Sequence, residues 1–296
     1  MRRVRGVDIL LQLKTGIAMA RHEKVEESTV SVGGIRVSYH KAGEGPALVL
    51  VHGLVGSARN WDQNIQFLAH FRTVYALDLA NMGQSERVPG IDAGLEATAD
   101  RVSACMSALG IESADVAGHS HGGAISMMLA ARHPEKVRRL VLFAPANPFC
   151  NLGRQLIGFY RTRPGMWFAR QIPFLPRVLH RTALSRMYGD PTRVLEGALD
   201  GYTEGLNPGT IEHVLGIVRS WADDMKLLGD SLHKVARLPT LLIWGDQDRA
   251  VGLSSGQKLA TMLGARLVVI PGVGHVSFAE SPEVCNREVS EWLRAA

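Results

Sequence analysis

A serine flanked by two histidines and two glycines occurs at Gly118-His119-Ser120-His121-Gly122. The pattern G-x-S-x-G is typical of a sharp turn from a strand into a helix, with the serine at the apex. Glycine is needed two positions before and after the apex, because larger side chains would collide there. Apolar residues precede the turn, and a helical pattern over residues 124–132 follows it. Ser120 is therefore a candidate nucleophile, with a plain glycine-rich loop as the alternative interpretation.

A serine hydroxyl is a weak nucleophile near neutral pH, so it needs a histidine to accept its proton and an acid to orient that histidine. Both residue types occur downstream of Ser120. Asp246 and Asp248 follow the apolar run "LLIWG", and His275 lies in a glycine-bearing loop after "RLVVIPG". The chain thus offers the three groups for acyl transfer in the order Ser, Asp, His.

The elements that must position these residues alternate along the chain. Helical periodicity, as in residues 92–109, fills most of the intervals between short apolar runs. These runs have the pattern of buried parallel strands and cover residues 47–53, 73–79, 114–118, 139–146, 240–246 and 266–272. A hairpin with a tight turn at Gly33-Gly34 precedes them, so the sheet is expected to begin near Ser28. We predict an α/β fold with a mostly parallel sheet, helices on both faces and a site at the carboxyl ends of the strands.

Helical pattern and punctuating prolines interrupt this alternation over residues 147–235, which predicts an inserted helical cap above the carboxyl end of the sheet. The core domain then consists of residues 28–146 and 236–296. Residues 1–27 begin like a signal peptide, but polar residues interrupt their apolar stretch, so we interpret them as an amphipathic accessory helix. Since no run of about eighteen apolar residues occurs, no membrane span is expected.

Charge is mixed along most of the chain, so the net charge of +5 does not favour nucleic-acid binding. Residues 154–186 are the exception, because they contain seven arginines among several aromatic residues and no Asp or Glu. A solvated face of amphipathic helices is the simpler interpretation, and weak contact with a membrane surface or an anionic substrate is the alternative. The amino-terminal helix is the other segment for which weak contact with a membrane surface stays open.

The three cysteines, Cys105, Cys150 and Cys285, are too few and too far apart for a disulfide framework or a metal site. A reducing compartment, the cytoplasm, is therefore the expected location.

The chain resembles the α/β-hydrolase fold family from about Ser28 to its carboxyl terminus. Four motifs carry the resemblance: "HGLVGSARNW", "DLANMGQS", "GHSHGG", and "GDQD" followed by "GVGHVSFAESPE". The second departs slightly from the family pattern D-x-x-G-x-G-x-S, with Asn81 and Met82 before Gly83. The helical cap is the part where the resemblance is weakest.

Roles for single residues follow from this resemblance. It implies that Ser120 is the nucleophile and that His275 is the general base. It favours Asp248 as the orienting acid, with Asp246 as the alternative. The backbone N–H groups of His121 and Leu54 are implied as the oxyanion hole.

Reaction class must come from the site, because this fold hosts many chemistries. Serine at position 120 argues against the dehalogenase and epoxide hydrolase branches, which have aspartate there. We predict a serine esterase that cleaves carboxylic esters with short- to medium-chain or aromatic acyl groups, through an acyl-serine intermediate. Its expected partner is a small ester, and no cofactor or metal is implied. Phe149, Trp167 and Trp221 in the cap are expected to line the acyl pocket.

Three alternatives on the same fold stay open. A carbon–carbon bond hydrolase of ring-cleavage products would use the same three residues. A cofactor-free dioxygenase would use His275 mainly as a base, and "SHGG"-like sequences around the serine occur in such enzymes. A ligand receptor would keep the three residues and bind a small molecule without consuming it.

Overall fold

The structure, a computed structural model, describes residues 24–150, 154–194 and 197–295. These residues form an eight-stranded sheet in the order β1-β2-β4-β3-β5-β6-β7-β8. The strands are β1 (Glu26–Val32), β2 (Ile35–Ala42), β3 (Ala47–Val51), β4 (Thr73–Leu77), β5 (Ala114–His119), β6 (Val137–Phe143), β7 (Thr240–Gly245) and β8 (Arg266–Ile270). β2 pairs antiparallel with β1 and β4, and all pairs from β4 to β8 are parallel. The predicted mostly parallel α/β sheet is confirmed.

The hairpin of β1 and β2 turns at Gly33 and Gly34, whose φ angles are 58° and 84°. Two consecutive positive φ angles give the turn that matches the twist of a hairpin, and glycine adopts them without strain. β1 begins at Glu26, so the accessory helix that we predict over residues 1–27 is wrong for Glu26 and Glu27, which pair with β2. Residues 1–23 of that segment lie outside the described residues.

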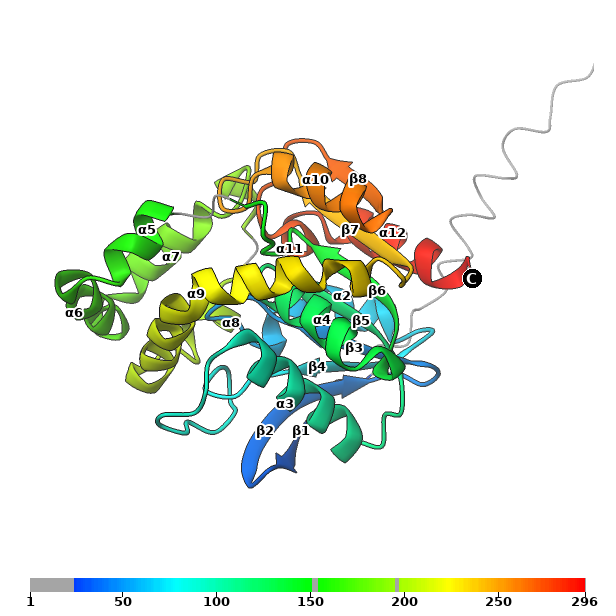
Figure 1. Cartoon of the computed structure of the whole chain (residues 1–296), viewed down its shortest axis with the longest axis horizontal. Coiled ribbons are helices and arrows are strands. Elements are labelled where there is room, and N and C mark those ends of the chain that lie inside the picture. Colours follow the sequence, from blue (N-terminus) through cyan, green and yellow to red (C-terminus); the bar gives the residue numbers. More distant parts are fainter. Residues whose placement is uncertain (1–23, 151–153, 195–196, 296) are drawn as a thin grey trace, which may run out of the picture.

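Helices cover both faces of the sheet (Figure 1). Strand residues alternate between the faces, so Val49 and Val51 belong to one apolar core, and Leu48 and Leu50 to the other. The first core is closed by α3 (Leu95–Ala108), α4 (His121–Arg132), α10 (Leu253–Leu263) and part of α9 (Pro208–Val235). The second is closed by α2 (Asp62–Leu68), α11 (Ser277–Glu280) and α12 (Pro282–Arg294).

Between β6 and β7 the chain forms the helical insertion that the sequence predicts. Its shorter helices are α5 (Arg154–Tyr160), α6 (Arg163–Gln171), α7 (Arg177–Ser185) and α8 (Asp200–Thr203). In Figure 1, α5, α6 and α7 project away from the sheet. The insertion has a small core of its own, in which Ala169 of α6 packs with Ile211 and Leu215 of α9.

The 28-residue helix α9 belongs to both parts of the molecule. Ile211 and Leu215 near its start pack in the insertion. Leu228, Leu232 and Val235 are buried in the first of the two apolar cores, the main core, beside α4. The change from cap to core packing therefore lies inside α9, before the boundary that we predict at residue 235. Among the described residues, neither α9 nor any other helix has the length and apolar character needed to cross a bilayer.

Candidate active site

Ser120 occupies a strained turn between β5 and α4. Its φ of 52° and ψ of −120° lie in a region that non-glycine residues rarely adopt. A Cβ at Gly122 would overlap the backbone of His52, and a Cβ at Gly118 would overlap the backbone of Gly122. The Ser120 N–H donates to the carbonyl of Phe143 at 3.0 Å, which fixes the turn against β6. Ser120 itself stays partly exposed.

His275 and Asp248 form a buried pair. Nδ1 of His275 lies 2.8 Å from Oδ2 of Asp248, and the two side chains are 3% and 0% exposed. Oδ1 of the same carboxylate accepts the backbone N–H groups of Ala250 and Val251, each at 2.8 Å. Because an ionised carboxylate only accepts hydrogen bonds, this contact places the imidazole proton on Nδ1 and leaves Nε2 as a proton acceptor.

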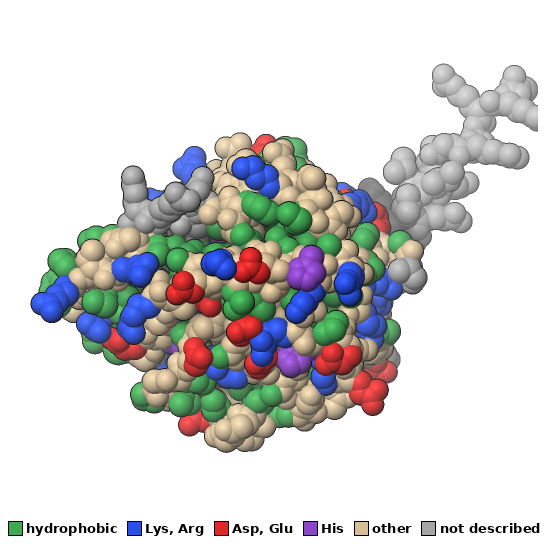
Figure 2. Space-filling view, in the orientation of Figure 1, with side chains coloured by type: hydrophobic (Ala, Val, Ile, Leu, Met, Phe, Trp, Pro, Cys, Tyr) green, Lys and Arg blue, Asp and Glu red, His purple; other side chains and the backbone are tan. Residues whose placement is uncertain are grey.

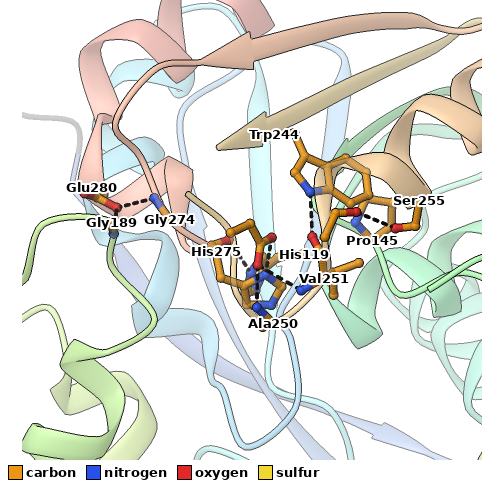
Figure 3. A network of polar contacts seen from close by, with 12 residues as sticks. His119, Pro145, Gly189, Trp244, Ala250, Val251, Ser255, Gly274, His275 and Glu280 are labelled. Atoms are coloured by element: carbon orange, nitrogen blue, oxygen red, sulfur yellow. Dashed lines mark hydrogen bonds and ion pairs between the residues drawn. The ribbon is translucent and has the colours of Figure 1, made fainter. Parts of the chain in front are cut away.

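Asp246 has a different role. It is exposed, and its Oδ1 accepts the backbone N–H of Gly272 at 2.7 Å. It thus ties the end of β7 to the turn after β8, and the structure brings Asp248 rather than Asp246 to His275. The loop of Asp248 is further fixed by Trp244, whose Nε1 donates to the carbonyl of Val251 at 2.8 Å (Figure 3).

A contact from the insertion supports the loop that carries His275. The backbone N–H of His275 donates to the carbonyl of Met187 at 2.7 Å. The buried carboxylate of Glu280 accepts N–H groups from Gly189, Asp190 and Gly274, at 2.9, 3.0 and 2.7 Å. Figure 3 shows Glu280 between Gly189 and Gly274, with His275 next along the loop. Sequence reasoning assigned no role to Glu280, although it lies in the quoted "GVGHVSFAESPE".

His119, the residue before Ser120, lies against His275. The two ring centroids are 4.6 Å apart, and Nε2 of His119 lies 3.1 Å from the carbonyl oxygen of His275. Burial, followed by the neighbouring His275, holds the pKa of His119 well below its ordinary value. A neutral His119 that donates from Nε2 therefore supports the His275 backbone. The sequence indicated no function for this residue.

The two backbone N–H groups expected to form an oxyanion hole have no hydrogen-bond partner within residues 24–150, 154–194 and 197–295. His121 is the first residue of α4, so its N–H is one of those that a helix leaves without an acceptor, at the end that favours negative charge. Leu54 follows β3 in a loop held by His52. Nδ1 of His52 donates to the carbonyl of Gly53 at 2.7 Å, and Nε2 accepts the N–H of Leu79 at 3.0 Å.

The three aromatic residues expected to line the pocket have different surroundings. The ring of Trp221 stacks on His121, with centroids 6.0 Å apart, and Phe149 and Trp221 are half-buried against the main core. Trp167 lies on α6 with 64% of its surface exposed, so most of this side chain is in contact with solvent. Its exposure follows from its position, because the opposite side of α6 packs on α9.

The arrangement has the parts for nucleophilic acyl chemistry: a partly exposed serine at a strained turn, an oriented imidazole and unpaired N–H donors. In the part of the chain that the structure describes, no group of three or more His, Cys, Asp or Glu residues is placed to hold a metal ion.

Known proteins resemble this chain over most of its length. The 2-hydroxymuconate semialdehyde hydrolase of Pseudomonas sp. strain CF600 is 31% identical, over 83% of this chain and 86% of that protein. The 2-hydroxy-6-oxo-2,4-heptadienoate hydrolase of Pseudomonas putida is 28% identical, over 90% and 95%. The structure of a meta-cleavage product hydrolase from Pseudomonas fluorescens IP01 has a TM-score of 0.74 at 27% identity, over 90% and 97%. A family model described as alpha/beta hydrolase fold matches residues 46–282, and the chain therefore belongs to the α/β hydrolase fold family.

Proposed function

We propose that this protein hydrolyses a carbon–carbon bond in 2-hydroxy-6-oxo-dienoates. The observation that carries the proposal is the likeness to two hydrolases of such compounds, at 31% and 28% identity. The buried pair of His275 and Asp248 supports it, because the reaction needs an oriented base. Ester hydrolysis, which we predict from the sequence, becomes the second candidate.

The chemistry of such a substrate fits these groups. A proton moves from the 2-hydroxyl to C5, which leaves ketones at C2 and C6 with a double bond between C3 and C4. Ser120 Oγ then attacks C6 and gives its proton to Nε2 of His275. When the C5–C6 bond breaks, its electron pair is delocalised through the double bond onto the C2 oxygen, and the resulting carbanion takes the proton from His275.

The acyl-serine that remains needs water. His275, neutral again, accepts a proton from water, and the hydroxide attacks the acyl carbon and releases the carboxylic acid and Ser120. In both halves a negative oxygen develops on C6, where the N–H groups of His121 and Leu54 would donate to it. The His275–Asp248 hydrogen bond would stabilise the imidazolium that forms in each half.

Ester hydrolysis, the second candidate, shares the hydrolysis of the acyl-serine with this cycle. It differs in the first half, where an alkoxide leaves instead of a carbanion. The candidates therefore differ in what stabilises the leaving group, and substrate preference separates them. The test uses 2-hydroxy-6-oxo-6-phenylhexa-2,4-dienoate and para-nitrophenyl butyrate at equal protein concentration. Consumption of the dienoate is followed by loss of its absorbance and by mass-spectrometric detection of benzoate.

We expect kcat/KM for the dienoate to exceed that for the ester by at least about 100-fold, since a site built for one leaving group discriminates by several kcal/mol. Turnover of the ester alone would make ester hydrolysis the function. If neither compound is consumed by folded protein, oxygen uptake and ligand-induced shifts in melting temperature distinguish the dioxygenase from the receptor, and either result would overturn the proposal.

A further inference from the structure

Large apolar side chains are exposed on one part of the insertion. Nine large apolar side chains are exposed in the described residues, and six of them fall within residues 159–179. The six are Phe159, Trp167, Phe168, Phe174, Val178 and Leu179. Trp167 is 64% exposed and Phe174 is 72% exposed, so these rings lie largely in solvent. Such a concentration of exposed apolar surface marks an interaction site more often than chance scatter does.

The packing of the helices explains why these side chains point outward. α6 turns its small residues Gly165 and Ala169 toward its neighbours, and Ala169 packs against α9. Trp167 and Phe168 lie on its other side. α7 contains no buried residue at all, and its Val178 and Leu179 are 65% and 50% exposed. Two successive amphipathic helices thus present apolar sides that no described part of the chain covers.

Arginines alternate with these apolar residues along the sequence. Residues 154–186 contain no Asp or Glu. Two of the arginines reach acids elsewhere, since Arg170 pairs with Glu212 and Arg181 lies 3.8 Å from Asp200. Four exposed arginines have no ion-pair partner in the described ranges, namely Arg161, Arg163, Arg177 and Arg186. Figure 2 shows hydrophobic and basic side chains next to each other over the projecting end of the molecule.

We propose that residues 159–186, named here the cap tip, bind the surface of a bilayer that contains anionic phospholipids. Aromatic side chains such as Trp167 are suited to the boundary between headgroups and acyl chains. Unpaired arginines beside them attract anionic headgroups. The same charges oppose self-association, because two copies of the cap tip would bring like charges together. This inference is independent of the reaction at Ser120.

The test measures binding of the full-length protein to vesicles. Vesicles of phosphatidylcholine and phosphatidylglycerol in equal amounts are compared with vesicles of phosphatidylcholine alone, by cosedimentation and by tryptophan fluorescence. We expect binding to the anionic vesicles that weakens as salt is added, with a blue shift that Trp167→Phe removes. The Ser120→Ala protein is measured in parallel, so that lipid turnover by the protein does not alter the vesicles.

Variants of the cap tip should weaken this binding. Arg163→Gln with Arg177→Gln is expected to lower the partition coefficient by about 25-fold, or about fivefold for each charge. Trp167→Ser with Phe174→Ser should lower it by at least about tenfold. Arg237→Gln with Lys258→Gln removes the same charge from exposed positions outside the cap tip and should leave most of the binding.

The proposal is overturned if the wild-type protein does not bind anionic vesicles, or if both cap-tip double variants bind them as tightly as the wild type does. It is also overturned if binding is lost only in a protein with Arg2, Arg3 and Arg5 changed to Gln, since the amino-terminal bases would then be the contact. Sedimentation velocity measures the oligomeric state and so tests whether a second copy of the protein covers the cap tip instead. A dimer that needs Trp167 and Phe174 and does not bind vesicles would assign the surface to a second copy.

Discussion

Glu280 Oε2 accepts the N–H of Gly274 at 2.7 Å, one residue before His275, and also accepts the N–H of Gly189 in the insertion. One buried carboxylate thus fixes two segments that lie far apart in the sequence. Because Met187 and Gly189 both contact residues 274–275, the position of His275 depends on the insertion as well as on the sheet.

Glu280→Gln should therefore disturb both stability and turnover. The three N–H groups that face this side chain all donate, so the amide nitrogen of glutamine would leave at least one of them without an acceptor. We expect the free energy of unfolding to fall by about 1–3 kcal/mol and kcat to fall with it. Urea denaturation and kinetics measure the two effects. Glu283→Gln, at an exposed position in the next helix, is the matched control.

The two acids after β7 should behave differently. Asp248→Asn replaces one carboxylate oxygen with an NH2 group, so the side chain can no longer accept both the His275 Nδ1 proton and the N–H groups of Ala250 and Val251. We expect kcat to fall by up to about 10⁴-fold. Asp246→Asn leaves that pair intact and should change kcat by less than about tenfold, because Asp246 contacts Gly272 instead. Steady-state kinetics of both variants show which acid orients His275, and circular dichroism confirms that both variants fold. A larger loss in the Asp246 variant would contradict this assignment.

Ser120 and His275 should act as one unit. Ser120→Ala and His275→Ala are each expected to remove nearly all turnover, by roughly a millionfold, and the double variant should lose little more. A fluorophosphonate probe with mass spectrometry tests the same unit without a substrate. Wild-type protein should carry the label on Ser120, and His275→Ala should carry far less. Equal labelling in both proteins would mean that His275 does not activate the serine.

Acid should destabilise the protein through its buried histidines. Burial lowers the pKa of His121 from 6.5 to about 4. Between these values the unfolded chain binds more protons than the folded one, so the free energy of unfolding falls as pH falls. From pH 7 to pH 5, the contribution of His121 to this loss is about 2 kcal/mol.

His121→Gln should accordingly make stability less dependent on pH over that range. Urea denaturation at both pH values measures the difference, and His70→Gln at an exposed position is the control. If the His121 variant lost as much stability as wild type, the imidazole of His121 would have to be protonated in the folded protein.

Local chemistry made much of the core predictable. Short apolar runs separated by helical patterns fix which segments form a parallel sheet, and glycines at positions 118 and 122 mark the turn at Ser120 because no larger side chain fits there. The order of Ser120, Asp248 and His275 is readable because each follows a strand, and parallel strands end at one edge of a sheet.

Contacts across the chain were not predictable in the same way. Helical periodicity shows that α6 and α7 have an apolar side, but it does not show whether another element covers that side, so Trp167 was expected in a pocket and is exposed. Glu280 carries no local signal either, since its partners Gly189 and Asp190 belong to another region and contribute only backbone N–H groups. A buried acid is recognised from its neighbours in space.

The attachment of Met187, Gly189 and Asp190 to the loop of His275 bears on how such enzymes diversify. Replacing the whole insertion by recombination or grafting would also replace residues 187–190. Residues 274 and 275 would then lose the backbone groups that lie against them. An exchange that ends before Met187 would keep residues 187–190 together with the core domain that they contact. The segment that can be exchanged without changing the backbone partners of residues 274 and 275 is thus smaller than the insertion, and it ends between α7 and Met187.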